Sequence, residues 1–162
     1  GWKGGLWSGE VEPESLYPIW KVIQWLSADQ MRHLKAFILS EGRRYEDLVP
    51  ATDLVSPNRS GKPNSNVGWA YCARTADQQL FLFYFEKECP QATVSGAQPG
   101  AKYQARWFNP RTGKWAGAKI LTADADGKIV LPAFPGGSEK SDDDWAMKLS
   151  LAAGSPAAPG KE

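Results

Sequence analysis

The sequence has 162 residues with a net charge of +1, which is enough chain for one ordinary domain with an extension. The balanced charge gives no basic patch for nucleic acid or an anionic membrane, and no apolar run is long enough to span a bilayer, so we expect neither partner. Eight Trp residues are unusual, and such rings either fill a core or stack on sugars.

Residues 1–50 carry a helical pattern. In residues 14–26 the apolar side chains recur at helical spacing: Leu16, Ile19, Trp20, Ile23 and Leu26. Ser27 and Gln30 have the form of a capping box for a second helix that ends at Gly42. The apolar face of that second helix is Met31, Leu34, Phe37 and Ile38. Both patterns predict helices, and alone this segment would expose Trp20, Ile23 and Trp25 on a face built for a partner.

From about residue 52 the pattern changes to short strands. We expect strands at 67–74, 80–85, 92–94, 103–108, 114–121, 128–131 and 145–151. Residues 80–85 are apolar on both faces, which predicts a buried central strand. The fold class is therefore mainly β, an antiparallel β-sandwich preceded by an α-helical segment. Residues 152–162 are rich in Ala, Gly, Pro and Ser and are expected to form a disordered tail.

The most informative stretch is residues 103–115. Asn109, Pro110 and Gly113 suit the first, second and exit positions of a turn, and alternating residues flank them. This predicts a β-hairpin with Trp107 on one arm and Trp115 on the other. Trp69, Tyr71, Trp107 and Trp115 would form either an exposed platform for a polysaccharide or part of the core. Strand alternation favours the core for at least some of them.

The reactive side chains give no catalytic or metal constellation. In a hairpin that turns near Asp77, Cys72 lies opposite Phe83, so a disulfide to Cys89 needs the chain to bend back; we favour two unpaired thiols in or near a core. His33, the only histidine, is interpreted as a surface or boundary residue. We interpret residues 124–127 as a hairpin turn and not a calcium loop, and the acidic run 142–144 as a solvated strand entry. No cofactor and no metal are expected.

Four segments, in order, resemble one setting: residues 28–35, 48–55, 105–113 and 143–149. They are similar to the C-terminal part of apiosidase-like glycoside hydrolases, in which a β-sandwich named "putative collagen-binding domain" follows a (β/α)8 barrel. The resemblance implies that residues 1–50 are the last barrel loop and helices, which complete or pack on the barrel. It implies that residues 51–151 are the sandwich and 152–162 the tail.

The resemblance also implies a function: the C-terminal portion of a glycoside hydrolase acting on a plant or bacterial polysaccharide, with the sandwich as an accessory, stabilising domain. Such an enzyme needs two carboxylates about 5 to 10 Å apart. The family carries them on earlier barrel strands, so no catalytic residue is expected here. Glu10, Glu12 and Glu14 are interpreted as solvated loop acids. The expected partner is the remainder of the barrel, on the same polypeptide or a separate chain.

Residues near Gly1 would then lie close to the barrel's active face. Trp2 and Trp7 would stack on a carbohydrate and Glu10 would bind its hydroxyls; the alternative is that both Trp are packing residues. A polysaccharide substrate favours a secreted or periplasmic protein, whose signal would lie upstream of Gly1. The alternative function is a free-standing carbohydrate- or collagen-binding module without catalysis, marked by an exposed aromatic row. A third interpretation is a purely structural domain.

Overall fold

The computed structural model describes residues 26–63, 65 and 67–154. An α-helix and a 3-10 helix come first, followed by nine strands and one further 3-10 turn. Their bounds are α2 (Leu26–Ile38), η2 (Leu39–Asp47), β1 (Leu48–Pro50), η3 (Thr52–Leu54), β2 (Val55–Ser56), β3 (Ala70–Thr75), β4 (Leu80–Phe85), β5 (Thr93–Val94), β6 (Lys102–Asn109), β7 (Lys114–Thr122), β8 (Ile129–Val130) and β9 (Trp145–Leu151).

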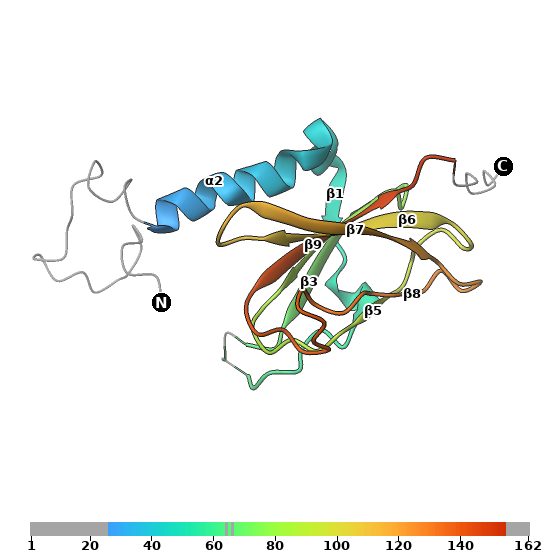
Figure 1. Cartoon of the computed structure of the whole chain (residues 1–162). Coiled ribbons are helices and arrows are strands. Elements are labelled where there is room, and N and C mark those ends of the chain that lie inside the picture. The colour runs from blue at the N-terminus through green and yellow to red at the C-terminus, as the bar shows by residue number, and fades with distance from the viewer. Residues whose placement is uncertain (1–25, 64, 66, 155–162) are drawn as a thin grey trace, which may run out of the picture.

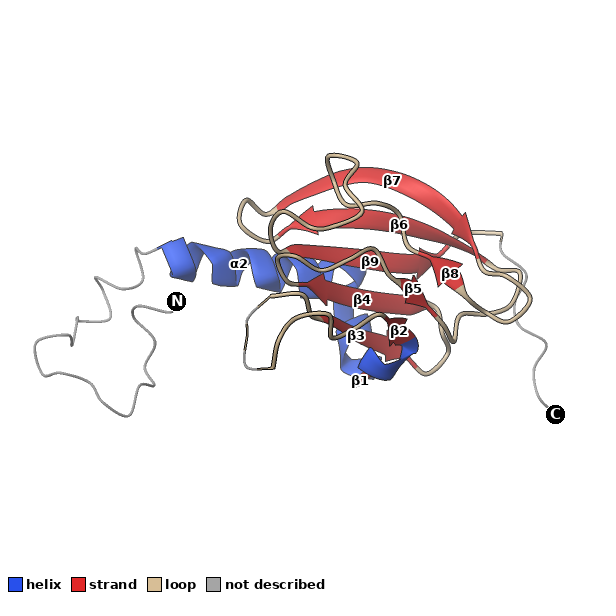
Figure 2. Cartoon of the chain, turned by 90° about the horizontal axis from the view of Figure 1, so that it is seen from below, coloured by secondary structure: helices blue, strands red, loops and turns tan. Residues whose placement is uncertain are grey.

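These elements form three layers. The middle layer is a six-stranded sheet in the order β1-β3-β4-β9-β6-β7, and a three-stranded sheet, β2-β5-β8, covers one of its faces. The helix α2 lies across the other face (Figure 1) and extends beyond the ends of the strands (Figure 2). Neighbouring strands are antiparallel throughout both sheets. The expected mainly β, antiparallel sandwich preceded by a helical segment is confirmed.

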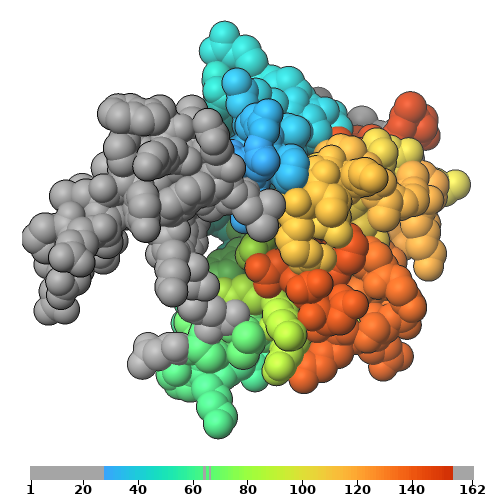
Figure 3. Space-filling view, turned by 60° about the vertical axis from the view of Figure 1, so that its left-hand side comes forward, coloured from blue at the N-terminus to red at the C-terminus, as the bar shows by residue number. Residues whose placement is uncertain are grey.

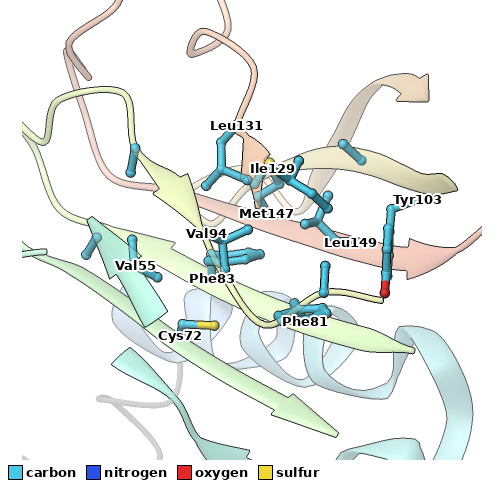
Figure 4. Close-up of a cluster of buried hydrophobic side chains, with 14 of the residues drawn as sticks. Val55, Cys72, Phe81, Phe83, Val94, Tyr103, Ile129, Leu131, Met147 and Leu149 are labelled. Atoms are coloured by element: carbon cyan, nitrogen blue, oxygen red, sulfur yellow. The ribbon is translucent and has the colours of Figure 1, made fainter. Parts of the chain in front are cut away.

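The main core lies between the two sheets. Side chains on a strand point alternately to the two faces of the sheet, and every second residue enters this core. In β6, for example, Tyr103, Ala105 and Trp107 are buried, whereas Lys102 and Gln104 are exposed. Central strands contribute Phe81, Phe83, Met147 and Leu149, and the small sheet contributes Val55, Val94 and Ile129 (Figure 4). Burial of these side chains is the main stabilising term of the sandwich.

A second, smaller core lies between α2 and the opposite face of the six-stranded sheet. Phe37 of the helix packs with Leu80, Leu82, Phe108 and Ala146, while Ile38, Leu48 and Trp115 pack at the edge of this cluster. Both faces of β4 are therefore covered, which explains its apolar sequence and confirms its expected central position.

The helix differs from its prediction in both bounds and burial. Ser27 lies inside α2, so it is not the cap, and the α-helix ends at Ile38 instead of Gly42. The chain continues as the 3-10 helix η2, kinked at Gly42, whose φ is +60°. Of the predicted apolar face, Phe37 is buried, but Met31 and Leu34 are 52% and 48% exposed. Among the described residues, the sheet therefore covers only the C-terminal half of this apolar face, Phe37 and Ile38.

The strand predictions hold best where the strands are long. The positions 80–85 and 145–151 match β4 and β9, whereas β3 begins at Ala70 instead of residue 67. The short strands β1 and β2 were not predicted, because two or three residues carry no periodicity. Most of the expected tail, residues 155–162, lies outside the described part.

Candidate functional site

The turn between β6 and β7 is held by its own first residue. The side-chain oxygen of Asn109 accepts hydrogen bonds from the backbone N–H groups of Arg111 at 2.9 Å and Thr112 at 3.2 Å. The N–H of Gly113 donates to the Asn109 carbonyl at 2.8 Å. This confirms the predicted hairpin and explains why Asn stands at the first turn position.

The same turn is in contact with the helix α2. The ring nitrogen Nδ1 of His33 lies 3.0 Å from the carbonyl oxygen of Pro110, and it must donate because a carbonyl only accepts. A Cβ atom on Gly113 would lie 2.5 Å from Cδ2 of His33, and Gly113 has φ of +68°. His33 is half-buried, which confirms its boundary interpretation. Helix and turn are thus in direct contact.

Arg111 joins this turn to the start of β9. Its Nη1 donates to the carbonyl oxygen of Asp144 at 2.6 Å, and its Nη2 lies 3.3 Å from the Asp143 carboxylate. Its guanidinium carbon lies 5.4 Å from the ring centre of Trp145, within cation–π distance. The acidic run is therefore only partly a solvated strand entry: Asp142 and Asp143 are exposed, but Asp144 is half-buried and bonded.

The end of the helical segment is held over the sheet by an ion pair between a buried lysine and a partly exposed glutamate. Nζ of Lys148, on β9, lies 2.5 Å from Oε1 of Glu41 and 3.2 Å from Oγ of Ser40. Lys148 is only 5% exposed, and its ammonium also lies 4.9 Å from the ring centre of Trp115. A buried lysine in a sheet needs such a partner, so this contact fixes η2 on β9.

An aromatic cluster packs α2 against the six-stranded sheet. The rings of Phe37 and Phe108 lie 5.2 Å apart, those of Phe37 and Trp115 5.7 Å, and those of Phe108 and Trp115 4.9 Å. Figure 3 looks toward this end of the molecule: α2 is blue, the β6–β7 hairpin gold, and the segment that leads into β3 green. The helical segment is thereby attached to the sandwich through His33 and Phe37 of α2 and through Glu41 and Arg44 of η2, where Nη2 of Arg44 lies 2.7 Å from Oδ2 of Asp77.

Three aromatic residues on the helix-side face of the six-stranded sheet, beyond this cluster, form what we call the outer strip: Trp69, Tyr71 and Tyr84. Tyr71 and Tyr84 are direct cross-strand partners and are 40% and 38% exposed. The hydroxyl of Tyr71 donates to Oε1 of Glu86 at 3.3 Å, and that of Tyr84 donates to Oδ2 of Asp144 at 2.8 Å. Burial and the neighbouring carboxylate raise the pKa of each tyrosine.

Two polar atoms beside the outer strip have no hydrogen-bond partner. They are Nε1 of Trp69, a donor, and Oε2 of Glu86, an acceptor, and both are buried. Their backbones are joined, because the N–H of Glu86 donates to the carbonyl of Trp69 at 2.9 Å. Each unpartnered buried group costs about 1–3 kcal/mol. The guanidinium of Arg59 lies 5.2 Å from the centre of the Trp69 ring.

The four predicted platform residues divide between core and surface. Trp107 is 7% exposed and lies 5.0 Å from the ring of Phe134, and Trp115 lies under the helix, so both belong to cores. Trp69 and Tyr71 remain on the outer face, where Tyr84 joins them. Tyr84 was missed because it counted as apolar in a strand read as buried on both faces.

The predicted carbohydrate-binding residues Trp2, Trp7 and Glu10, and the acids Glu12 and Glu14, lie outside the described residues. Within the described part there is no group of His, Cys, Asp and Glu residues placed to hold a metal ion. No helix in residues 26–63, 65 and 67–154 is long and apolar enough to cross a membrane. The described residues thus offer two surfaces for function: the exposed face of α2 and the outer strip.

The two thiols are inert in this fold. Cys72 and Cys89 are free and buried, and Cys72 pairs with Phe83 in register, as expected from the turn. Burial raises the pKa of each thiol to about 12. Neither cysteine is a candidate nucleophile, because the thiolate is the reactive form.

Comparison with known proteins places these features in context. A family model described as "Putative collagen-binding domain of a collagenase" matches residues 49–150. A search of curated protein sequences gave no match.

Among solved structures, one titled "Glycoside hydrolase" aligns with a TM-score of 0.52 and 18% identity over 85% of this chain and 28% of that chain. A glycoside hydrolase family 5 structure from Bacteroides vulgatus ATCC 8482 aligns with a TM-score of 0.56 and 20% identity over 85% of this chain and 27% of its own. At this identity the likeness establishes the fold. This chain spans little more than a quarter of the length of either structure.

Proposed function

The chain belongs to the family described as "Putative collagen-binding domain of a collagenase", and from that premise we propose that it serves as the accessory β-sandwich of a glycoside hydrolase. In this role it docks on a (β/α)8 catalytic domain through α2 and stabilises that domain. The similarity of fold to two glycoside hydrolases supports the proposal. So does the position of the helix ahead of the sandwich in the chain.

One observation carries the proposal: the apolar face of α2 is split. Phe37 is buried against the sandwich, whereas Met31 and Leu34 are about half exposed on the same helix. Exposed apolar side chains on an amphipathic helix mark a contact with another body. Because His33 and Glu41 also tie the helix to the sandwich, anything bound to Met31 and Leu34 is held rigidly to it.

Under this proposal the chemistry belongs to the catalytic domain. Two carboxylates there would hydrolyse the glycosidic bond, one as acid and one as nucleophile or base. The contribution of this chain is positional, except that Trp2, Trp7 and Glu10 would line a sugar subsite at the barrel's active face. A polysaccharide substrate, too large to enter a cell, implies a secreted or periplasmic enzyme.

The test is a charge placed on the exposed face of the helix. In the complete hydrolase, Leu34→Lys is expected to lower the apparent Tm of the catalytic domain by on the order of 5 °C, because it disrupts an apolar contact. The same substitution in the 162-residue chain alone should leave its own Tm nearly unchanged, since Leu34 is 48% exposed there.

A matched control is Ile120→Lys, because Ile120 is 52% exposed on the edge strand β7 and far from α2 in the chain. It should leave both melting temperatures unchanged. If Leu34→Lys behaves like Ile120→Lys in the complete hydrolase, docking through α2 is wrong.

The alternative, a free-standing binding module without catalysis, requires the chain to act with no catalytic partner. The outer strip supports a binding role, but the exposed face of α2 favours an attached domain. The collagen in the family's description belongs to that collagenase, and we propose no collagen binding for this chain.

A further inference from the structure

We propose that the outer strip, formed by Trp69, Tyr71 and Tyr84, binds a neutral polysaccharide. The three rings belong to one face of the sheet, and Tyr71 and Tyr84 are 40% and 38% exposed although they come from two paired strands. The exposed rings of Tyr71 and Tyr84 offer flat apolar surfaces to the C–H faces of sugar rings, and Trp69, half-buried with Arg59 over its ring, borders them. The site lies on the sandwich itself and does not depend on docking through α2.

The tyrosine rings are already ordered for this task. The hydroxyl of Tyr71 is bonded to Glu86 at 3.3 Å and that of Tyr84 to Asp144 at 2.8 Å. Asp144 is itself fixed by the N–H of Lys87 at 2.8 Å. Side chains held in place before binding lose little conformational freedom when a ligand arrives, so the strip is preorganised.

The exposed polar groups beside the rings favour a ligand rich in hydroxyl groups. The carboxylates of Glu86 and Asp144 accept from the hydroxyls of Tyr71 and Tyr84 at the surface, at 3.3 Å and 2.8 Å. A carboxylate has more lone pairs than one such bond uses, so it can also accept from a sugar hydroxyl. Nε1 of Trp69 and Oε2 of Glu86 are buried, so they belong to the base of the strip and are not ligand contacts.

The charges around the strip favour a neutral sugar. Two carboxylates, Glu86 and Asp144, are hydrogen-bonded to the tyrosine hydroxyls and are balanced by the guanidiniums of Arg59 and Arg111, so the strip has no excess positive charge to attract an acidic sugar. The nearby guanidinium of Arg59 is engaged over the ring of Trp69 at 5.2 Å. Carboxylates are depleted at the centre of protein interfaces, which argues against a protein as the main occupant.

Affinity electrophoresis of the 162-residue chain tests this proposal. The gels contain arabinoxylan, galactomannan or mixed-linkage β-glucan as neutral probes and polygalacturonate as the acidic probe. We expect at least one neutral polymer to retard the chain, and Tyr71→Ala to weaken that binding about tenfold or more through loss of a stacking surface. Tyr84→Ala, at the exposed cross-strand partner of Tyr71, should have the same effect.

The matched control is Tyr45→Ala, because Tyr45 is a tyrosine of similar exposure, 38%, in η2. It should bind like the unchanged chain, and thermal unfolding checks that each variant is folded. The proposal is overturned if no neutral polymer retards the chain, if Tyr71→Ala is retarded equally, or if polygalacturonate binds best. It is also overturned if Tyr71→Ala lowers the Tm of the catalytic domain in the complete hydrolase while polysaccharide retards the variant as much as the unchanged chain, because the strip would then be a docking surface.

These failures are separable from failure of the proposed function. Sugar binding is measured on the isolated chain with changes in β3 and β4, whereas docking is measured on the complete hydrolase with a change in α2.

Discussion

At the scale of single residues, Gly113 shows how one position can serve the turn and the helix together. Its φ of +68° lies in the left-handed region, which favours glycine. Its missing side chain also leaves room for the ring of His33, whose Nδ1 bonds the same turn at Pro110. A side chain here would strain the hairpin and push on the helix.

Gly113→Ala is therefore expected to lower the free energy of unfolding by about 2 kcal/mol, from backbone strain and the contact with His33. Urea denaturation of the isolated chain measures it. Gly117→Ala is the matched control: Gly117 lies in β7 with nothing within 4 Å of an added Cβ. The control should change stability by less than about 0.5 kcal/mol. Equal effects of the two substitutions would contradict the role given to Gly113.

The thiols make a prediction about reactivity. With the pKa raised to about 12 for both Cys72 and Cys89, the thiolate fraction at pH 8 is roughly one in ten thousand. We expect a disulfide reagent to leave both thiols unmodified in the native chain at pH 8 and to modify both in denaturant, as counted by intact mass. Raising the pH should speed the reaction. Rapid native labelling, or fewer than two thiols in denaturant, would refute this picture.

At the scale of elements, α2 and η2 are held by contacts of different kinds. Phe37 contributes apolar burial, and Glu41 neutralises a lysine that is only 5% exposed. An apolar contact can adjust in register, but a buried ammonium needs its counter-charge within hydrogen-bond distance. The pair between Lys148 and Glu41 therefore fixes how the helical segment sits on the sheet.

Glu41→Gln is expected to lower the free energy of unfolding by about 2 kcal/mol, because it leaves the ammonium of Lys148 buried without a counter-charge, while the partly exposed Glu41 is screened by solvent. Glu46→Gln is the control, since Glu46 pairs with Arg43, whose side chain is 85% exposed. Exposed pairs contribute about 0–1 kcal/mol. Thermal or urea unfolding of both variants compares them. Similar losses would mean that the pair between Lys148 and Glu41 does not hold η2 on the sheet.

The elements that could be predicted from the sequence are those with enough residues to show a period. The apolar run of β4 and the alternation of β6 gave type and position, and Asn109 with Gly113 gave the hairpin. Strands of two or three residues, such as β1 and β2, are defined by their partners in the sheet and not by their own composition.

The candidate surfaces were less predictable, because they form from residues far apart in the chain. Arg111 and Asp144 each stood in a recognised segment, but nothing in either segment says that one bonds the other. Likewise, helical spacing placed Met31, Leu34 and Phe37 on one face, but which of them the sheet covers depends on how far the helix overhangs it. These contacts are determined by how the elements pack against one another, and the local sequence pattern does not encode that.

At the scale of the whole molecule, the six-stranded sheet is covered on both faces at its centre. Without α2, the side chains of Leu80, Leu82 and Phe108 would lose their cover on the helix side. The helix is thus part of the packing of the sandwich, although the family match begins only at residue 49. A fragment cut at residue 51 would expose an apolar patch, so the helical segment should be kept in any expression of the domain.

The position of β9 has a consequence for synthesis on the ribosome. Of the described strands it is the last to be made, yet it lies in the middle of the sheet, between β4 and β6. Until it emerges, the nascent chain holds two separate half-sheets whose inner edges have unpaired backbone groups. The helical segment is made earlier but cannot complete its contacts, because the lysine that pairs with Glu41 lies on β9. The sandwich therefore closes only after β9 has been made, and a chaperone that shields those edges until then would raise its yield.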